Sequence, residues 1–98
     1  MTKPVRWTTP ALRQLEDIQD YIAQHDPSAA FNLAERIRRH INEQLPEHPL
    51  SGRIGRIENT YELVITGSDY IIAYRVKHDS IEVLAVKHGA QAWPTSFT

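Results

Sequence analysis

Three short runs rich in isoleucine, valine and tyrosine follow one another near the end of the chain, and they constrain its fold more than any other feature. The runs are Tyr61–Ile65, Tyr70–Val76 and Ile81–Lys87. Turn-forming residues separate them, first Thr66–Asp69 and then Lys77–Ser80, and each set fits a four-residue hairpin loop. The pattern predicts a three-stranded antiparallel β-meander.

The first half of the chain predicts two helices joined by a tight turn. A threonine precedes Pro10 and Asp26 precedes Pro27, and a capping side chain followed by proline is typical of a helix start. Apolar residues then recur at steps of three and four, so each helix has one apolar stripe. The stripes are Leu12, Leu15, Ile18, Tyr21 and Ile22 in the first helix, and Ala30, Ala34, Ile37, Ile41 and Leu45 in the second.

The length of 98 residues allows one domain with a single modest core. We therefore expect one α+β domain over residues 1–98. It has a short N-terminal strand at Val5–Trp7, an antiparallel helical hairpin over about 9–45, the meander over about 60–88 and a C-terminal tail over 89–98. The chain contains no cysteine, so packing alone must hold the fold together.

The sequence shows no segment typical of a signal peptide or a membrane span. The N-terminal residues Met1–Arg6 lack the apolar core of a signal peptide, and no stretch reaches the ~20 apolar residues of a membrane span. We expect a cytoplasmic protein that does not bind a membrane. The net charge of −1 argues against a surface that binds nucleic acid chiefly by neutralising phosphates.

The two hairpin loops fix a provisional strand register. Val76 faces Ile81, and Ile65 faces Tyr70. Strand alternation then gives one apolar face that covers the helices and a second face with an apolar strip bounded by charge. Two helices cannot cover both faces, so the strip needs another cover, which we expect to be a partner chain with the tail covering part. The strip consists of Val64, Ile71, Ala73, Leu84 and Val86.

The same register places the charged side chains of the meander. Arg75 lies opposite Glu82, which predicts a cross-strand ion pair. His88 lies opposite Asp69, roughly 20 Å from Arg75 at ~3.3 Å per residue, so Arg75 and His88 cannot act on one phosphate. We expect no metal and no cofactor, because the other histidines lack the spacing of metal ligands. These are His25, His40, His48 and His78.

Several short segments stand in a characteristic order along nearly the whole chain. They are Leu15–Ile18 with Tyr21–Ile22, Glu47–Pro49, Glu62–Val64, Tyr70–Val76 and Val83–His88. Their order and spacing, on this architecture, resemble the ParE/RelE superfamily of toxins from bacterial type II toxin–antitoxin pairs. The resemblance implies a growth-inhibiting toxin, neutralised by a cognate antitoxin that an adjacent gene encodes. The antitoxin would wrap a segment around the toxin and cover the apolar strip, and operator DNA would be bound only through the antitoxin.

Two mechanisms occur in the superfamily. RelE-like members cut messenger RNA in the ribosomal A site, with basic side chains that activate the ribose hydroxyl and stabilise the phosphate transition state. ParE-like members act on DNA gyrase without chemistry of their own. In the RelE pattern basic residues line the meander strands, whereas this chain has Glu62 and Ile71 near such positions. These departures favour gyrase as the target, although Tyr61 stands where many ParE-like relatives carry an arginine.

Two alternatives to a gyrase-directed toxin stay open. A ribosome-dependent mRNA interferase, an endoribonuclease, would use Lys87 and His88 at the end of the sheet with Arg53 and Arg56 from the preceding loop, because histidine titrates near neutrality and can transfer protons. Alternatively, the His88 ring forms a structural hydrogen bond to Asp69 or to a carbonyl of the tail. A degenerate toxin would retain only antitoxin binding and autoregulation.

The C-terminal tail carries the candidates for contact with the target. They are Gln91, Trp93 and Phe97. Large apolar side chains of this kind dominate many protein interfaces. Trp93 and Phe97 can equally anchor the tail to the core of its own chain, so the sequence leaves both roles open.

Overall fold

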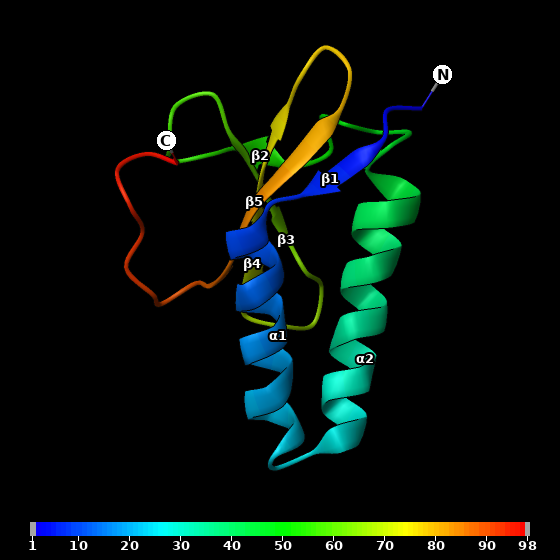
Figure 1. Cartoon of the computed structure of the whole chain (residues 1–98), viewed down its shortest axis with the longest axis vertical. Helices are drawn as coiled ribbons and strands as arrows, with labels where there is room; N and C mark the ends of the chain where they lie inside the picture. Colours follow the sequence, from blue (N-terminus) through cyan, green and yellow to red (C-terminus); the bar gives the residue numbers. More distant parts are fainter. Residues whose placement is uncertain (1, 98) are drawn as a thin grey trace.

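The computed structural model describes residues 2–97, which form two α-helices, one π-helical turn and a five-stranded sheet (Figure 1). The elements are β1 (Val5–Trp7), α1 (Thr9–Ala23), α2 (Pro27–Arg38), η1 (Arg39–Gln44), β2 (Arg53–Ile54), β3 (Tyr61–Val64), β4 (Tyr70–Val76) and β5 (Ile81–His88). The predicted α+β class, helical hairpin and meander are confirmed. No helix in the described range is long and apolar enough to cross a membrane.

The sheet extends the predicted meander by one strand on each side. Its order is β1-β5-β4-β3-β2, with β1 parallel to β5 and the other neighbours antiparallel. Strand β2 was not predicted, because Arg53 and Arg56 were expected to lie in a loop. In the structure Arg53 pairs with Glu62 and Ile54 with Tyr61. The segment that follows the helices is therefore fixed to the edge of the sheet.

Both predicted helix caps are present. The Thr8 hydroxyl accepts a hydrogen bond from the backbone N–H of Ala11 at 3.3 Å, and the Asp26 carboxylate accepts one from Ala29 at 3.1 Å. Each cap satisfies a backbone donor that the first helical turn leaves free. The Thr8 hydroxyl also donates to the carbonyl of Val83 at 2.9 Å, so the start of α1 is fixed to β5.

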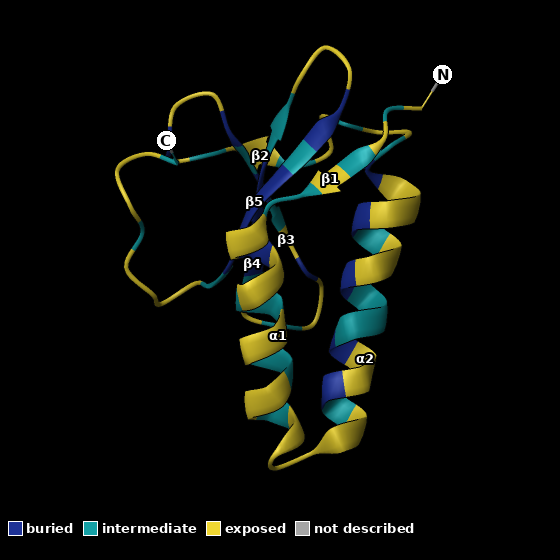
Figure 2. Cartoon of the chain, in the orientation of Figure 1, coloured by how far each residue is buried: buried dark blue, intermediate teal, exposed yellow. Residues whose placement is uncertain are grey.

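The hydrophobic core lies between the helical hairpin and one face of the sheet. Figure 2 shows α2 with buried residues on the side toward α1, α1 half-buried on its inner side, and both helices exposed outside and at the tip of the hairpin. Burial of these side chains is the main favourable contribution to folding. The core cluster consists of Ala11, Leu33, Ile37, Ile41, Leu45, Ile65, Ile72, Tyr74, Ile81, Val83 and Val86.

A β-bulge in β5 changes the predicted register in the second half of that strand. Val76 faces Ile81 as predicted, but past the bulge Tyr70 faces His88, so the predicted pairing of His88 with Asp69 is wrong. Leu84 is the extra residue, and a one-residue shift moves every later side chain to the other face. Val86 is accordingly 1% exposed and belongs to the core under the helices. Its predicted place on the opposite face is also wrong.

Helix α1 supplies hydrogen-bond partners for the bulged strand. The backbone N–H of Val86 donates to Gln14 Oε1 at 2.8 Å, beside the bond from Thr8 to Val83. A bulge leaves backbone groups outside the ladder, and buried groups of this kind need partners. Gln14 and Thr8 therefore stabilise the shifted register.

Replacing Gln14 by leucine keeps the size of the side chain and removes the acceptor for Val86. We expect a loss of about 1–3 kcal/mol in the free energy of unfolding, the cost of an unsatisfied buried donor. Gln19→Leu on the same helix is the matched control, because no hydrogen bond of its side chain is found within residues 2–97. Urea unfolding followed by circular dichroism measures both, and equal effects of the two substitutions would contradict the assignment.

Candidate functional site

The open face is defined here as the face of the sheet that points away from α1 and α2. Ile71, Ala73 and Leu84 lie in its strands and are already buried in the single chain. The expectation that these three residues need a partner as cover is therefore wrong. Val64, with 46% of its surface exposed, is the member of the predicted strip that stays accessible.

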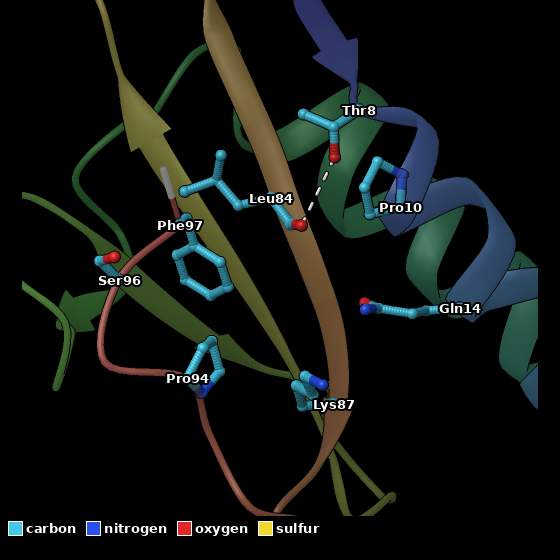
Figure 3. A pocket seen from close by; sticks show the side chains of 8 residues that line it. All are labelled: Thr8, Pro10, Gln14, Leu84, Lys87, Pro94, Ser96 and Phe97. Carbon is cyan, nitrogen blue, oxygen red and sulfur yellow. Dashed lines mark hydrogen bonds between the residues drawn. The ribbon is translucent and has the colours of Figure 1, made fainter.

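The C-terminal tail passes over this face. Figure 3 shows Phe97 beside Leu84, and Pro94 beside Lys87. A pocket of about 440 Å³ separates the tail from the start of α1. Its lining residues are Thr8, Pro10, Gln14, Leu84, Lys87, Pro94, Ser96 and Phe97. The tail is thus a neighbour of the apolar strip at Leu84, as expected for part of the strip.

The buried carboxylate of Glu62 gathers the two arginines of the β2 segment. Glu62 is 3% exposed. Arg53 donates from Nη2 to Oε1 at 3.0 Å, and Arg56 donates to Oε2 from Nε at 3.0 Å and from its backbone N–H at 2.9 Å. Burial raises the pKa of Glu62, but the hydrogen bonds from Arg56 and Arg53 outweigh it and lower this pKa to about 2. Glu62 is therefore ionised, and both arginines are paired within the chain.

Arg56 links this cluster to the tail. Its guanidinium carbon lies 3.9 Å from the centre of the Trp93 ring, a cation–π contact. Trp93 Nε1 is buried, and no hydrogen-bond partner for it is found in the described chain. Trp93 thus acts as an anchor of the tail, whereas Gln91 is exposed and Phe97 lines the tail pocket.

The four candidate catalytic residues do not form one cluster. Lys87 lines the tail pocket, and Arg56 lies on Trp93. Arg53 and His88 both line a second pocket of about 580 Å³ at the end of the sheet. The structure therefore brings Arg53 and His88 to one pocket and Arg53 and Arg56 to Glu62, but it does not bring all four residues to one place.

His88 is held by structural contacts. Its Nδ1 accepts a hydrogen bond from the backbone N–H of Ala90 at 3.1 Å, and its Nε2 lies 3.7 Å from Asp69 Oδ2. Its ring packs edge-on against Tyr70 with 5.5 Å between ring centres. The predicted hydrogen bond to Asp69 is not formed, because 3.7 Å is too long for one, although the two side chains lie within ion-pair distance. The cross-strand pair of Arg75 and Glu82 is also confirmed, with Nε and Oε1 3.6 Å apart.

Tyr74 fixes the loop before β2, a role that the sequence did not indicate. Its buried hydroxyl donates to the carbonyl of Pro49 at 2.8 Å and accepts from the N–H of Gly52 at 2.9 Å. Burial raises the pKa of Tyr74. A Cβ atom on Gly52 would lie 2.6 Å from this hydroxyl, so glycine is required there. The placement of Arg53 and Arg56 therefore depends on a core tyrosine.

Comparison with known proteins places the chain beside one family and several relatives. Residues 5–93 match the family described as ParE toxin of type II toxin-antitoxin system, parDE. The chain is 47% identical over 92 residues to protein Y4kP of Sinorhizobium fredii, and the match covers 94% of each chain. It is 34% identical over 87 residues to "Toxin RelE2" of Caulobacter vibrioides, and this match covers 89% of the present chain and 96% of the relative.

Two solved structures share the fold. The ParDE toxin–antitoxin system of P. aeruginosa matches with a TM-score of 0.74 at 19% identity, covering 89% of this chain and 96% of that chain. The toxin–antitoxin complex RelBE2 of Mycobacterium tuberculosis matches with a TM-score of 0.64 at 25% identity, covering 90% and 99%. Each likeness includes both the helical hairpin and the sheet.

Proposed function

The chain belongs to the ParE toxin family of type II toxin–antitoxin systems, and from this premise we propose that it inhibits growth by acting on DNA gyrase and is neutralised by a cognate antitoxin. The proposed place of action is the cytoplasm. The proposed contacts with gyrase are the tail residues Gln91, Trp93 and Phe97. Val64 is the accessible part of the surface proposed for the antitoxin.

The pairing of Glu62 with Arg53 and Arg56 is the observation that supports gyrase over messenger RNA. Cleavage of RNA needs basic groups that converge on one phosphate and a group that takes the proton of the ribose hydroxyl. Here both arginines already donate hydrogen bonds to the buried carboxylate of Glu62, and its negative charge opposes the binding of a phosphate beside them. The arrangement supports a protein that acts through binding.

A second candidate function, cleavage of messenger RNA on the ribosome, has one specific observation in its favour. Arg53 and His88 line the same pocket, and a curated relative at 34% identity is named RelE2. In this alternative His88 would transfer a proton and Arg53 would bind the phosphate.

Controlled expression without antitoxin, followed by pulse labelling of DNA, RNA and protein, tests the choice. We expect DNA synthesis to stop first and His88→Ala to retain the toxicity of the unaltered chain, whereas loss of a general acid or base would lower activity about 10²–10⁴-fold. His78→Ala, in an exposed loop, is the matched control. If protein synthesis stops first, messages are cut and His88→Ala is inactive, the interferase is correct. Absence of any growth defect would instead indicate a degenerate toxin.

A further inference from the structure

A groove between α1 and the end of the sheet reaches His88 and Gln91, but its residues on α1 have no role in the function proposed above. Asp17, Ile18 and Tyr21 line it from one side of α1, since residues three and four apart share a helix face. Tyr70, His88 and Gln91 line it from the sheet and the tail. Its volume is about 320 Å³. We call these six residues the tyrosine groove.

Aromatic rings border the tyrosine groove on both sides. Tyr21 is 65% exposed, a large share for an aromatic side chain on a helix that otherwise packs on the core. Tyr70 is held edge-on against His88, and the hydrogen bond from Ala90 fixes the His88 ring. The faces of aromatic rings carry negative partial charge and attract cations.

A carboxylate without a counter-ion lies in the same groove. Asp17 forms no salt bridge within residues 2–97, and neither do Glu16 and Asp20 beside it on α1. Asp69, next to His88, is exposed and has only that histidine as an ion-pair partner among the described residues. The groove thus combines a free negative charge with aromatic surface, and it complements a cation that can stack.

We propose that the tyrosine groove receives an arginine side chain of the antitoxin. A guanidinium group is planar, stacks on aromatic rings and donates two parallel hydrogen bonds to a carboxylate, whereas the lysine ammonium is a strongly hydrated point charge. Asp17 accepts the hydrogen bonds, and Tyr21 and Tyr70 provide the stacking surface. The inference rests on membership of a toxin–antitoxin family and does not depend on gyrase as the target.

The first test titrates the full chain with N-acetyl-arginine amide and follows ring-proton resonances by NMR. N-acetyl-citrulline amide, which has nearly the same shape without the charge, is the control ligand. We expect saturable shifts of Tyr21, Tyr70 and His88 with the arginine compound alone. Asp17→Asn should weaken this binding about tenfold, because a charge-assisted hydrogen bond is lost, and Glu16→Gln should not. Equal shifts with citrulline, or unchanged binding to Asp17→Asn, would overturn the proposal.

The second test measures the affinity of the purified variants for the antitoxin encoded by the adjacent gene. Asp17→Asn and Tyr21→Leu should each bind it at least about tenfold more weakly, while both remain as toxic as the unaltered chain when expressed alone. Unchanged affinity overturns the proposal. Loss of toxicity without antitoxin would assign the groove to the target and overturn it as well. The affinity and the toxicity of these variants can be compared whether the toxin inhibits DNA synthesis or protein synthesis. An arginine site that fails these tests therefore leaves the gyrase proposal untouched, and the reverse also holds.

Discussion

Replacing Glu62 by glutamine is expected to lower the free energy of unfolding by about 3 kcal/mol at neutral pH. The pKa of Glu62 falls from 4.5 to about 2 in the folded chain, and one pKa unit corresponds to about 1.4 kcal/mol. The neutral amide keeps the shape of the side chain but removes the charge that holds Arg53 and Arg56. Urea unfolding at pH 7 measures the difference between the two proteins.

The same measurement has a definite pH dependence. The pKa of Glu62 is lower in the folded than in the unfolded chain, so its contribution is complete above about pH 4.5 and is lost as the pH falls toward 2. The difference in the free energy of unfolding between the unaltered protein and Glu62→Gln should therefore decrease from pH 4.5 downward and nearly vanish near pH 2. Glu58→Gln, at an exposed glutamate, is the matched control and should leave the curve unchanged. A difference in unfolding free energy that does not vary with pH would show that the charge of Glu62 does not stabilise the fold.

Val86→Asp is expected to destabilise the fold by more than about 4 kcal/mol, because it buries an unpaired charge in the core. The matched control is Val64→Asp, which places the same charge on a residue that is 46% exposed. A simple alternation along β5 would put Val86 on the open face, the face of Val64 in β3, whereas the bulge puts Val86 under the helices. The pair of substitutions therefore tests the bulge directly.

Thermal unfolding separates the two outcomes clearly. Each kcal/mol lost from the free energy of unfolding lowers the Tm of a domain of this size by about 4–8 °C. A loss of more than about 4 kcal/mol should therefore lower the Tm of Val86→Asp by more than about 16 °C. Val64→Asp should unfold within a few degrees of the unaltered protein. Similar stability of the two variants would show that Val86 does not lie in the core.

Regular periodicity made most of the fold predictable. The apolar stripes and the cap-plus-proline pairs located both helices, and the turn residues located the meander and the register near each turn. The bulge could not be predicted, because Val83, Leu84, Ala85 and Val86 are all apolar and give no alternation that a shift would interrupt. Because the extra residue Leu84 was not recognised, the predicted positions of both Val86 and His88 were wrong by one residue.

The candidate site was less predictable, because it depends on contacts between distant segments. Arg53 and Arg56 looked like a basic loop, and their pairing follows from the short strand β2, which brings them beside Glu62. Two residues between glycines carry almost no strand signal. The position of Trp93 on Arg56 likewise depends on the path of the tail, which no local pattern specifies.

The parallel pairing of β1 with β5 has a consequence for the timing of assembly. Val5 pairs with Ile81, so the first strand cannot take its place until the last strand of the sheet has been synthesised. Contacts between residues so far apart form late, because a long loop must close first. The sheet therefore gains its β1 edge only after all the strands between β1 and β5 have been made, and until then the apolar residues of β1 have no sheet to pack against.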